Sequence, residues 1–537
     1  MTLIETYIIL LVVCTAVGLL FSKTSVPTPL ILVMVGMLLS FMPGFPPISL
    51  RPELVLDVFL PLLVYPASTD LPWRDVKQNL RPIVLLSVGH VLFIAVLVAY
   101  VVHTLIPDLG WPMCFVMGAV IAPPDDLAIL AIADKIRLPY RVITILKAES
   151  LLNDATALIL FRFSLATLIT EVFSPSNAVL AFFLVVIGET LYGFIVGHAM
   201  GQLRIRIQDP MLQMMASLIT PFIAYLPAVK MGGSGVLATV ITGFVIGHSY
   251  IEKFPPDIRL SSRAVWLALS FVLQSLLFLL VGLNLHLTLQ GIATLSWHSI
   301  TYYCTTIVLT VIIGRFIWVY PATYLPRFLF PTIRKKDPYP PWQQPFMISW
   351  AGMRGVISLA AALAVPTLPT MIEGANPKDL LVFLVFAVIT ATLLIQGLSL
   401  PAMIKLLGLN KTGRQECYDE HLSEMTARLK IAKTVLRWLE KYKYEVKDNP
   451  DLYEKTQLRI REYQLRIQRL ETSLTNHSDQ EKHDTLQEFR ESSRLSALIN
   501  EIERHELLRL WRENKISFDV KTKLLQQLDH HYKRFAE

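Results

Sequence analysis

Apolar segments follow one another along the chain as far as Leu409, with short polar loops between them. Many of them are close to the roughly 20 residues that an α-helix needs to cross a bilayer. Hydropathy predicts about thirteen such spans. They begin near Leu3, Thr28, Glu53, Pro82, Trp111, Val142, Ala178, Met211, Gly233, Ala264, Ser299, Gln343 and Leu380. The pattern therefore favours an all-α polytopic membrane protein.

The pattern changes after Leu409. The remaining residues are rich in Glu, Lys, Arg, Gln and Leu, and their apolar positions recur at helical spacing, as in Leu422, Met425 and Leu429. We predict two domains, a transmembrane domain at 1–409 and a cytoplasmic helical tail at 410–537. A solvated or dimer-supporting tail, with helices paired as hairpins or coiled coil, is favoured over a ligand-sensing domain.

Composition agrees with membrane insertion and adds an orientation. The 537 residues are 53% hydrophobic and 17% charged, and the mean hydropathy is +0.50. The loops after odd-numbered spans contain 19 lysines and arginines, against three in the loops after even-numbered spans. Because positive residues gather in cytoplasmic loops, the N-terminus is predicted outside and the C-terminus in the cytoplasm. The net charge of +7 is explained by these loops. Nucleic-acid binding is not expected, because the sequence shows no basic patch interleaved with exposed aromatic residues.

Glycines recur at helical spacing in two of the predicted spans. Gly193, Gly197 and Gly201 lie in the seventh span, and Gly243 and Gly247 lie in the ninth. Small residues at this spacing let neighbouring helices approach closely. Packing within the chain is the favoured interpretation, with a contact between subunits as the alternative.

Pro123 and Pro124 are expected to interrupt the fifth span, because each removes a backbone donor and disfavours the α conformation in the residue before it. Residues 111–122 are too few to cross a bilayer alone, which favours a break within the span over a turn between two spans. Such a break persists in a membrane only where the freed carbonyls are buried in protein or face a cavity. Many transporters build ion sites at these breaks, and Asp125 and Asp126 lie in this one.

Four polar side chains share one face of the sixth span: Glu149, Ser150, Asn153 and Asp154. At about 100° per residue they cover a sector roughly 140° wide. A lone acid here would suit a helix cap or a structural hydrogen bond, but ionisable groups inside a membrane are costly and are functional candidates. Carboxylate, hydroxyl and amide oxygens are ligands that suit a small, hard cation.

The twelfth span contains Gly352, Arg354 and Gly355. A guanidinium that is always charged requires a carboxylate partner in an apolar span, and the flanking glycines let the backbone leave the helix. If the seventh span is a linker, spans one to six and eight to thirteen form two inverted six-helix repeats. The broken fifth and twelfth helices then correspond to each other.

In their order, these motifs resemble the monovalent cation:proton antiporter-1 family. The resemblance rests on Pro123–Asp125, Glu149–Phe161, Gly352–Leu359 and Gln396–Pro401, and it covers the chain to about residue 410. Within the family, the chain is most similar to bacterial sodium/proton antiporters with a long C-terminal tail. The resemblance implies a homodimer in the bacterial inner membrane that works by elevator-type alternating access and needs no cofactor.

The resemblance also implies roles for the polar residues. Asp154 would bind the cation and the proton in turn. Asp125, Ser150 and the backbone near the break would complete a Na+ site. Asn153, a neutral amide beside Asp154, implies that one cation exchanges for one proton, so that transport is electroneutral.

Glu149 is expected, from the same resemblance, to pair with Arg354 and hold the core together. Three positions depart from the family pattern. Pro124 stands where many members have a threonine, Asp126 adds a second acid, and Lys147 is an unusual charge near the site. These departures affect the expected ligand set and the cation preference.

The sequence thus predicts a secondary transporter and not an enzyme, exchanging Na+, or Li+, for H+ across the lipid bilayer. A K+/H+ antiporter of the same fold is the alternative that the sequence does not separate. A membrane sensor that does not transport is a third hypothesis. An intramembrane hydrolase is disfavoured, because the spans show no paired nucleophile and base and no metal motif.

Overall fold

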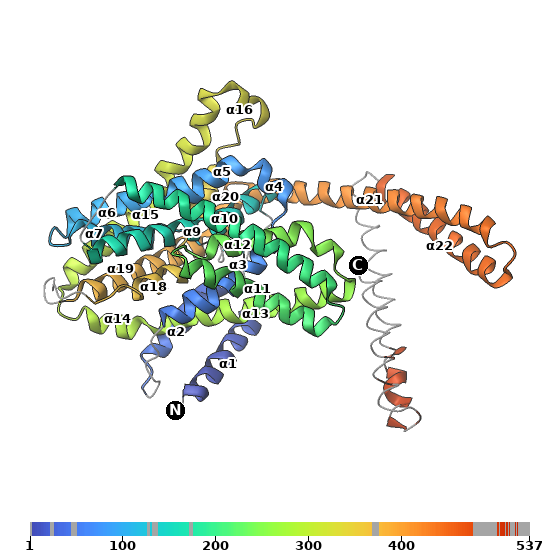
Figure 1. Ribbon diagram of the computed structural model, residues 1–537, viewed down its shortest axis with the longest axis horizontal. Helices are drawn as coiled ribbons and strands as arrows, with labels where there is room; N and C mark the ends of the chain where they lie inside the picture. Colours follow the sequence, from blue (N-terminus) through green and yellow to red (C-terminus); the bar gives the residue numbers. More distant parts are fainter. Residues whose placement is uncertain are drawn as a thin grey trace. The chain divides into compact units, whose positions relative to one another are not determined.

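The computed structural model describes residues 3–21, 26–43, 51–125, 129–130, 138–170, 175–367 and 375–475, with short stretches between residues 502 and 524. The elements in these ranges are helices (Figure 1). The chain divides into two units, Met1–Arg414 and Gln415–Glu537.

The helices of the first unit fall into two consecutive series. The first comprises α1 (Leu3–Phe21), α2 (Thr28–Ser40), η1 (Leu54–Phe59), α3 (Leu60–Thr69), α4 (Trp73–Gln78), α5 (Leu80–Val84), η2 (Leu85–His90), α6 (Val91–Leu105), α7 (Trp111–Ile121) and α9 (Tyr140–Thr170). The second comprises α10 (Pro175–Arg206), α11 (Pro210–Lys230), α12 (Val236–Ser249), η3 (Ile251–Lys253), α13 (Pro256–Leu283), α14 (Leu285–Gly291), α15 (Trp297–Leu329), α16 (Pro331–Lys336), α17 (Gln343–Trp350), α18 (Val356–Leu363), α19 (Pro377–Thr392), η4 (Leu393–Gly397) and α20 (Leu398–Leu406).

Seven helical stretches among the described residues are long and apolar enough to cross a membrane: Leu80–Leu105, Tyr140–Thr170, Val179–Arg206, Pro210–Lys230, Pro256–Gly291, Trp297–Leu329 and Pro377–Leu406. Five shorter apolar helices accompany them: Ile8–Phe21, Thr28–Ser40, Leu54–Thr69, Trp111–Ile121 and Val236–Ser249. With the short pair α17 and α18, these helices occur where the thirteen spans were predicted. The number that cross the membrane, their orientation and the inverted repeat stay predictions.

Local sequence explains where several of these helices begin. Asp209 and Asn376 each precede a proline, and their side chains accept hydrogen bonds from Leu212 N (2.9 Å) and Lys378 N (2.9 Å) at the starts of α11 and α19. An Asp or Asn at the N-cap satisfies a backbone donor that the first turn leaves free, and proline suits the next position.

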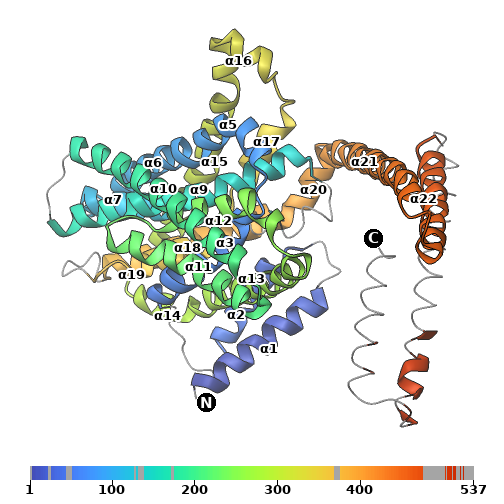
Figure 2. The ribbon, with the colours of Figure 1, turned by 45° about the vertical axis from the view of Figure 1, so that its right-hand side comes forward.

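The glycines at helical spacing lie where helices touch. On α10, a Cβ atom at Gly193 would be 2.5 Å from Ala238 O of α12, and one at Gly197 would be 2.8 Å from Val245 Cβ. On α12, a Cβ at Gly243 would overlap Ser68 of α3. Helix α12 therefore packs closely between α10 and α3 (Figures 1 and 2). The predicted packing role of these glycines is confirmed.

The second unit contains most of α21 (Leu409–Glu445) and all of α22 (Pro450–Thr475), and the two helices run side by side as an antiparallel hairpin (Figure 1). Asn449 begins α22 by accepting a hydrogen bond from Leu452 N at 3.3 Å. Lys433 of α21 forms an ion pair with Glu471 of α22 at 2.6 Å, and Leu439 is buried in the hairpin. The helical spacing of the tail thus produces paired helices.

Replacing Gly193 with leucine should destabilise the protein by roughly 1–3 kcal/mol or more, because the side chain has no room against the backbone of α12. The measurement is the thermal unfolding temperature of the purified protein. Gly188→Leu is the matched control on the same helix, since a Cβ there meets nothing within 4 Å. Equal losses in the two variants would contradict the close contact between α10 and α12.

Candidate ion-binding site

Two interrupted helices meet at the centre of the site. Helix α7 ends at Ile121, and the backbone continues without helical structure through Pro123 and Pro124 to Asp125. Helix α17 ends at Trp350, and α18 begins only at Val356. The amide of Asp125 donates a 2.7 Å hydrogen bond to Met353 O. The two unwound segments therefore contact each other backbone to backbone, and we call this contact the crossing.

Side chains satisfy the carbonyls that these breaks leave free. Asn153 Nδ2 of α9 donates to Pro124 O at 2.7 Å. Arg354 Nε donates to Ile121 O at 2.8 Å, and its Nη1 donates to Gly352 O at 2.5 Å. Since buried backbone groups inside a membrane need internal partners, these donors make the unwound conformation tolerable.

Arg354 is fixed from both ends. Its guanidinium spans the end of α7 and the break before α18, while its backbone amide donates to Thr392 Oγ1 of α19 at 3.1 Å. The side chain is 1% exposed. Arg354 therefore ties three helical segments together, chiefly through backbone carbonyls.

The partner of Glu149 differs from the one that we expected. Arg315 of α15 donates from Nη1 and Nη2 to the two carboxylate oxygens of Glu149, at 2.7 and 3.1 Å, and from Nε to Ile348 O at 3.1 Å. Both side chains of this ion pair are 1% exposed. The prediction that Glu149 pairs with Arg354 is wrong. The physical reason is that the Arg354 guanidinium donates its hydrogen bonds to the carbonyls of the breaks, whereas Arg315 forms a bidentate ion pair with Glu149.

Sequence reasoning missed Arg315, although a signal was present. It lies within the 33 residues of α15, a helix apolar enough to span a membrane. An arginine in such a helix needs a partner for the same reason as Arg354. A second residue that was missed is the acid Glu189 of α10, which is 4% exposed. It accepts from Gly235 N (2.9 Å), Ala238 N (3.2 Å) and the Ser234 hydroxyl (3.0 Å), and so caps the start of α12.

The two glycines of the twelfth span leave room for charged side chains. A Cβ atom at Gly352 would overlap the Arg315 side chain, and one at Gly355 would overlap the carboxylate of Asp125. Asp125 thus lies directly against the start of α18, where the free backbone amides of the first turn favour a negative charge. The absence of a side chain at Gly355 allows this approach.

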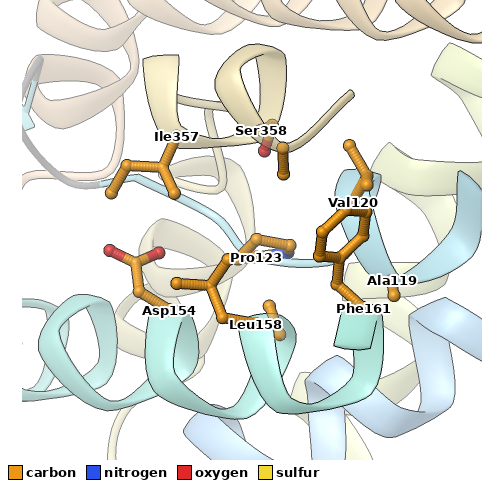
Figure 3. A pocket seen from close by; sticks show the side chains of 10 residues that line it. Ala119, Val120, Pro123, Asp154, Leu158, Phe161, Ile357 and Ser358 are labelled. Atoms are coloured by element: carbon orange, nitrogen blue, oxygen red, sulfur yellow. The ribbon is translucent and has the colours of Figure 1, made fainter. Parts of the chain in front are cut away.

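Asp154 lines a small pocket beside the crossing (Figure 3). Its carboxylate points from α9 toward Ile357 of α18, and Pro123, Leu158 and Ser358 line the same pocket. Asp154 is half-buried, whereas Ser358 is 3% exposed. Ser358 is a hydroxyl that we did not single out from the sequence, although it follows Gly355 by three residues.

Two of the remaining candidates lie on α9, and the third is not described. Ser150 is half-buried on α9, one turn before Asp154. Lys147 is exposed on the same helix. Asp126, the second acid at the break, lies outside the described residues. The structure therefore gathers Asp154, Asn153 and the segment up to Asp125, with Ser150 beside them.

The site contains oxygen ligands of the kind that hard cations prefer. They come from carboxylates, hydroxyls and carbonyl groups, with Asp154 and Ser358 at the pocket itself. Within the described residues, no group of three or more His, Cys, Asp or Glu side chains is arranged to hold a metal ion.

Comparisons with known proteins agree with these features. A family model described as "sodium/hydrogen exchanger, transmembrane" matches residues 8–406. An uncharacterised Na+/H+ exchanger of Mycobacterium tuberculosis is 33% identical over 402 residues, which cover 74% of this chain and 73% of that protein. A sodium, potassium, lithium and rubidium/H+ antiporter of Bacillus pumilus is 29% identical over 428 residues, covering 77% of this chain and 62% of that protein.

Among solved structures, the sodium proton antiporter MjNhaP1 of Methanocaldococcus jannaschii at pH 8 has a similar fold. The match has a TM-score of 0.55 and 17% sequence identity, and it covers 76% of this chain and 100% of that chain.

A double-mutant cycle should identify Arg315 as the partner of Glu149. Arg315→Met leaves a buried carboxylate unpaired and should cost about 3–5 kcal/mol. Adding Glu149→Gln to that variant should then cost little more. The measurement is the unfolding temperature of the purified variants.

The Arg354→Met variant is the control for this cycle, because it removes the other buried arginine of the site. Its effect should add to that of Glu149→Gln, because Arg354 bonds to backbone carbonyls. A larger coupling of Glu149 with Arg354 than with Arg315 would refute the pairing.

Proposed function

This chain belongs to the sodium/hydrogen exchanger family, and we propose that it is a secondary antiporter that exchanges Na+ for H+ at Asp154. The observation that carries the proposal is the carboxylate of Asp154 in a pocket beside two crossed helix breaks. Broken helices of this kind place backbone carbonyls and helix ends around transported ions in many secondary transporters.

Competition for one carboxylate couples the two ions. Asp154 holds either a proton or a cation, because neutralising its charge removes the attraction for the other. A neutral, occupied site crosses the low-dielectric interior more readily than a bare carboxylate. Exchange therefore follows from the cost of moving an uncompensated charge, and no further gate is needed for coupling.

Cation binding at Asp154 would draw on the oxygen atoms near it. Asp125 and Ser150 are assigned to this site, as the family resemblance implies. Ser358 is added because it lines the same pocket as Asp154. These donors are negative or neutral oxygens, which suits Na+ or Li+. Na+ is the cargo here and not a resident cofactor.

Asn153 supports electroneutral exchange of one cation for one proton. Its amide donates a hydrogen bond to Pro124 O. An ionised carboxylate at this position has no proton to donate. The position next to Asp154 is thus occupied by a neutral group that holds the break, leaving Asp154 as the exchanging acid.

Alternating access would move the two crossed breaks together. The Asp125 amide and Met353 O join the segments directly, and Arg354 connects both to α19. This supports an elevator-type mechanism, in which the crossing and α9 travel as one body. In our proposal the protein is a homodimer in the bacterial inner membrane, with its N-terminus outside and its tail in the cytoplasm.

K+ is the alternative cargo. The Bacillus pumilus relative is named for sodium, potassium, lithium and rubidium. The pocket donors of this chain are oxygens, a ligand type that both ions accept. Cation preference therefore has to be measured directly.

Asp154→Asn should abolish exchange while leaving a folded, membrane-inserted protein, because asparagine can neither take up the proton nor carry the charge that binds the cation. The measurement is the dissipation of a pH gradient in everted membrane vesicles after separate additions of sodium, lithium and potassium. The cation that dissipates the gradient in the wild type identifies the cargo.

Asp108→Asn is the matched control, since Asp108 is exposed in the loop between α6 and α7. It should retain wild-type exchange. Normal exchange by Asp154→Asn, with the protein shown to be present, would overturn the assignment of Asp154.

Electroneutral exchange predicts that the rate is independent of membrane potential. Proteoliposomes with a membrane potential imposed by a gradient of the permeant anion thiocyanate should exchange at the same rate as liposomes held at zero potential. Acceleration by a potential of one sign and slowing by the other would show net charge movement and exclude one-for-one exchange.

A further inference from the structure

The carboxylate of Asp337, in the segment that links α15 to α17, forms ion pairs with arginines of three helices. Asp337 accepts from Arg81 of α5 (2.8 Å), Arg141 of α9 (2.8 Å) and Arg327 of α15 (2.6 Å). Arg327 is 3% exposed and also donates from Nε to Asp337 O at 3.1 Å. Three guanidiniums therefore hold this segment in place at Asp337, just after α16.

The basic residues just before Asp337 point to solvent. Arg334, Lys335 and Lys336 are exposed at the end of α16. They form no ion pair with another described residue. Because Asp337 is already shared by three arginines, this part of the surface has an excess of positive charge.

Large apolar side chains lie beside these charges. Four of them lie between the last turn of α15 and the start of α17. Their exposed fractions are 74% for Phe328, 56% for Leu329, 55% for Phe330 and 55% for Trp342. We call residues 325–342 the basic–aromatic segment. Apolar side chains next to lysine and arginine are typical of surfaces at the membrane–water boundary.

The length of α15 places this segment near that boundary. The helix has 33 residues, or about 50 Å at 1.5 Å per residue, against about 30 Å of hydrocarbon. Trp297 and Tyr302, both exposed near its start, suit the opposite interface. About 20 residues further on the helix leaves the hydrocarbon, so its last turns and α16 reach the headgroup layer.

We propose that the basic–aromatic segment binds anionic phospholipid headgroups, with Arg334, Lys335 and Lys336 contacting phosphate and Phe328, Phe330 and Trp342 entering the acyl boundary. Charge complementarity favours an anionic lipid over a neutral one. The exposed aromatic side chains favour a lipid over a soluble phosphate, because a free ion would leave them in water. This inference does not depend on cation exchange.

Native mass spectrometry of the purified full-length protein tests the proposal. Phosphatidylglycerol should be retained in preference to phosphatidylcholine. Arg334→Gln/Lys335→Gln/Lys336→Gln should weaken that retention by up to about 100-fold, since each basic residue near an anionic surface contributes about fivefold. The preference should also shrink in high salt.

The control removes three positive charges elsewhere. Lys455→Gln/Arg461→Gln/Arg466→Gln alters exposed residues of α22 and should retain phosphatidylglycerol like the wild type. Phe328→Ser/Phe330→Ser keeps the charges and should also weaken lipid retention.

Three results would overturn the proposal. One is equal retention of phosphatidylglycerol by the wild type and the triple variant of α16. Another is equal retention of the two lipids by the wild type. The third is displacement of the lipid by inorganic phosphate at matched concentration, which would identify the ligand as a soluble anion.

Discussion

The backbone bond between Asp125 N and Met353 O is the contact on which the site depends. It joins two segments that a membrane would otherwise force into helix, because unpaired peptide groups are costly in hydrocarbon. Asn153 and Arg354 supply the remaining donors. The contact holds Asp125 against Gly355 at the start of α18, beside the pocket that Asp154 lines.

Each buried charge at the site also has a partner of its own. Glu149 and Arg315 neutralise each other between α9 and α15, and Arg354 is bound by carbonyl dipoles. A buried ion pair with well-placed hydrogen bonds is expensive to break from one side. The pair therefore holds α9 in register while leaving the carboxylate of Asp154 at the pocket.

Much of this arrangement was predictable from the sequence. Apolar length predicted the helices, Pro123 and Pro124 predicted the break, and the polar face of α9 predicted that Asn153 and Asp154 would lie together. The partner of Glu149 was not predictable in this way. Arginines on two apolar helices were equally eligible, and spacing along the chain does not say which guanidinium reaches a carboxylate and which reaches carbonyls.

Arg354 holds the two breaks together, whereas Asp154 lines the pocket. This separation affects how the ion preference of such a protein can change in evolution. The side chains that hold the crossing bond to backbone atoms, which every substitution leaves in place. The pocket itself is lined by a separate set that includes Ser358 and Ile357. Mutation can therefore change pocket size and polarity while the scaffold persists, so that new ion preferences become accessible by small steps without rebuilding the fold.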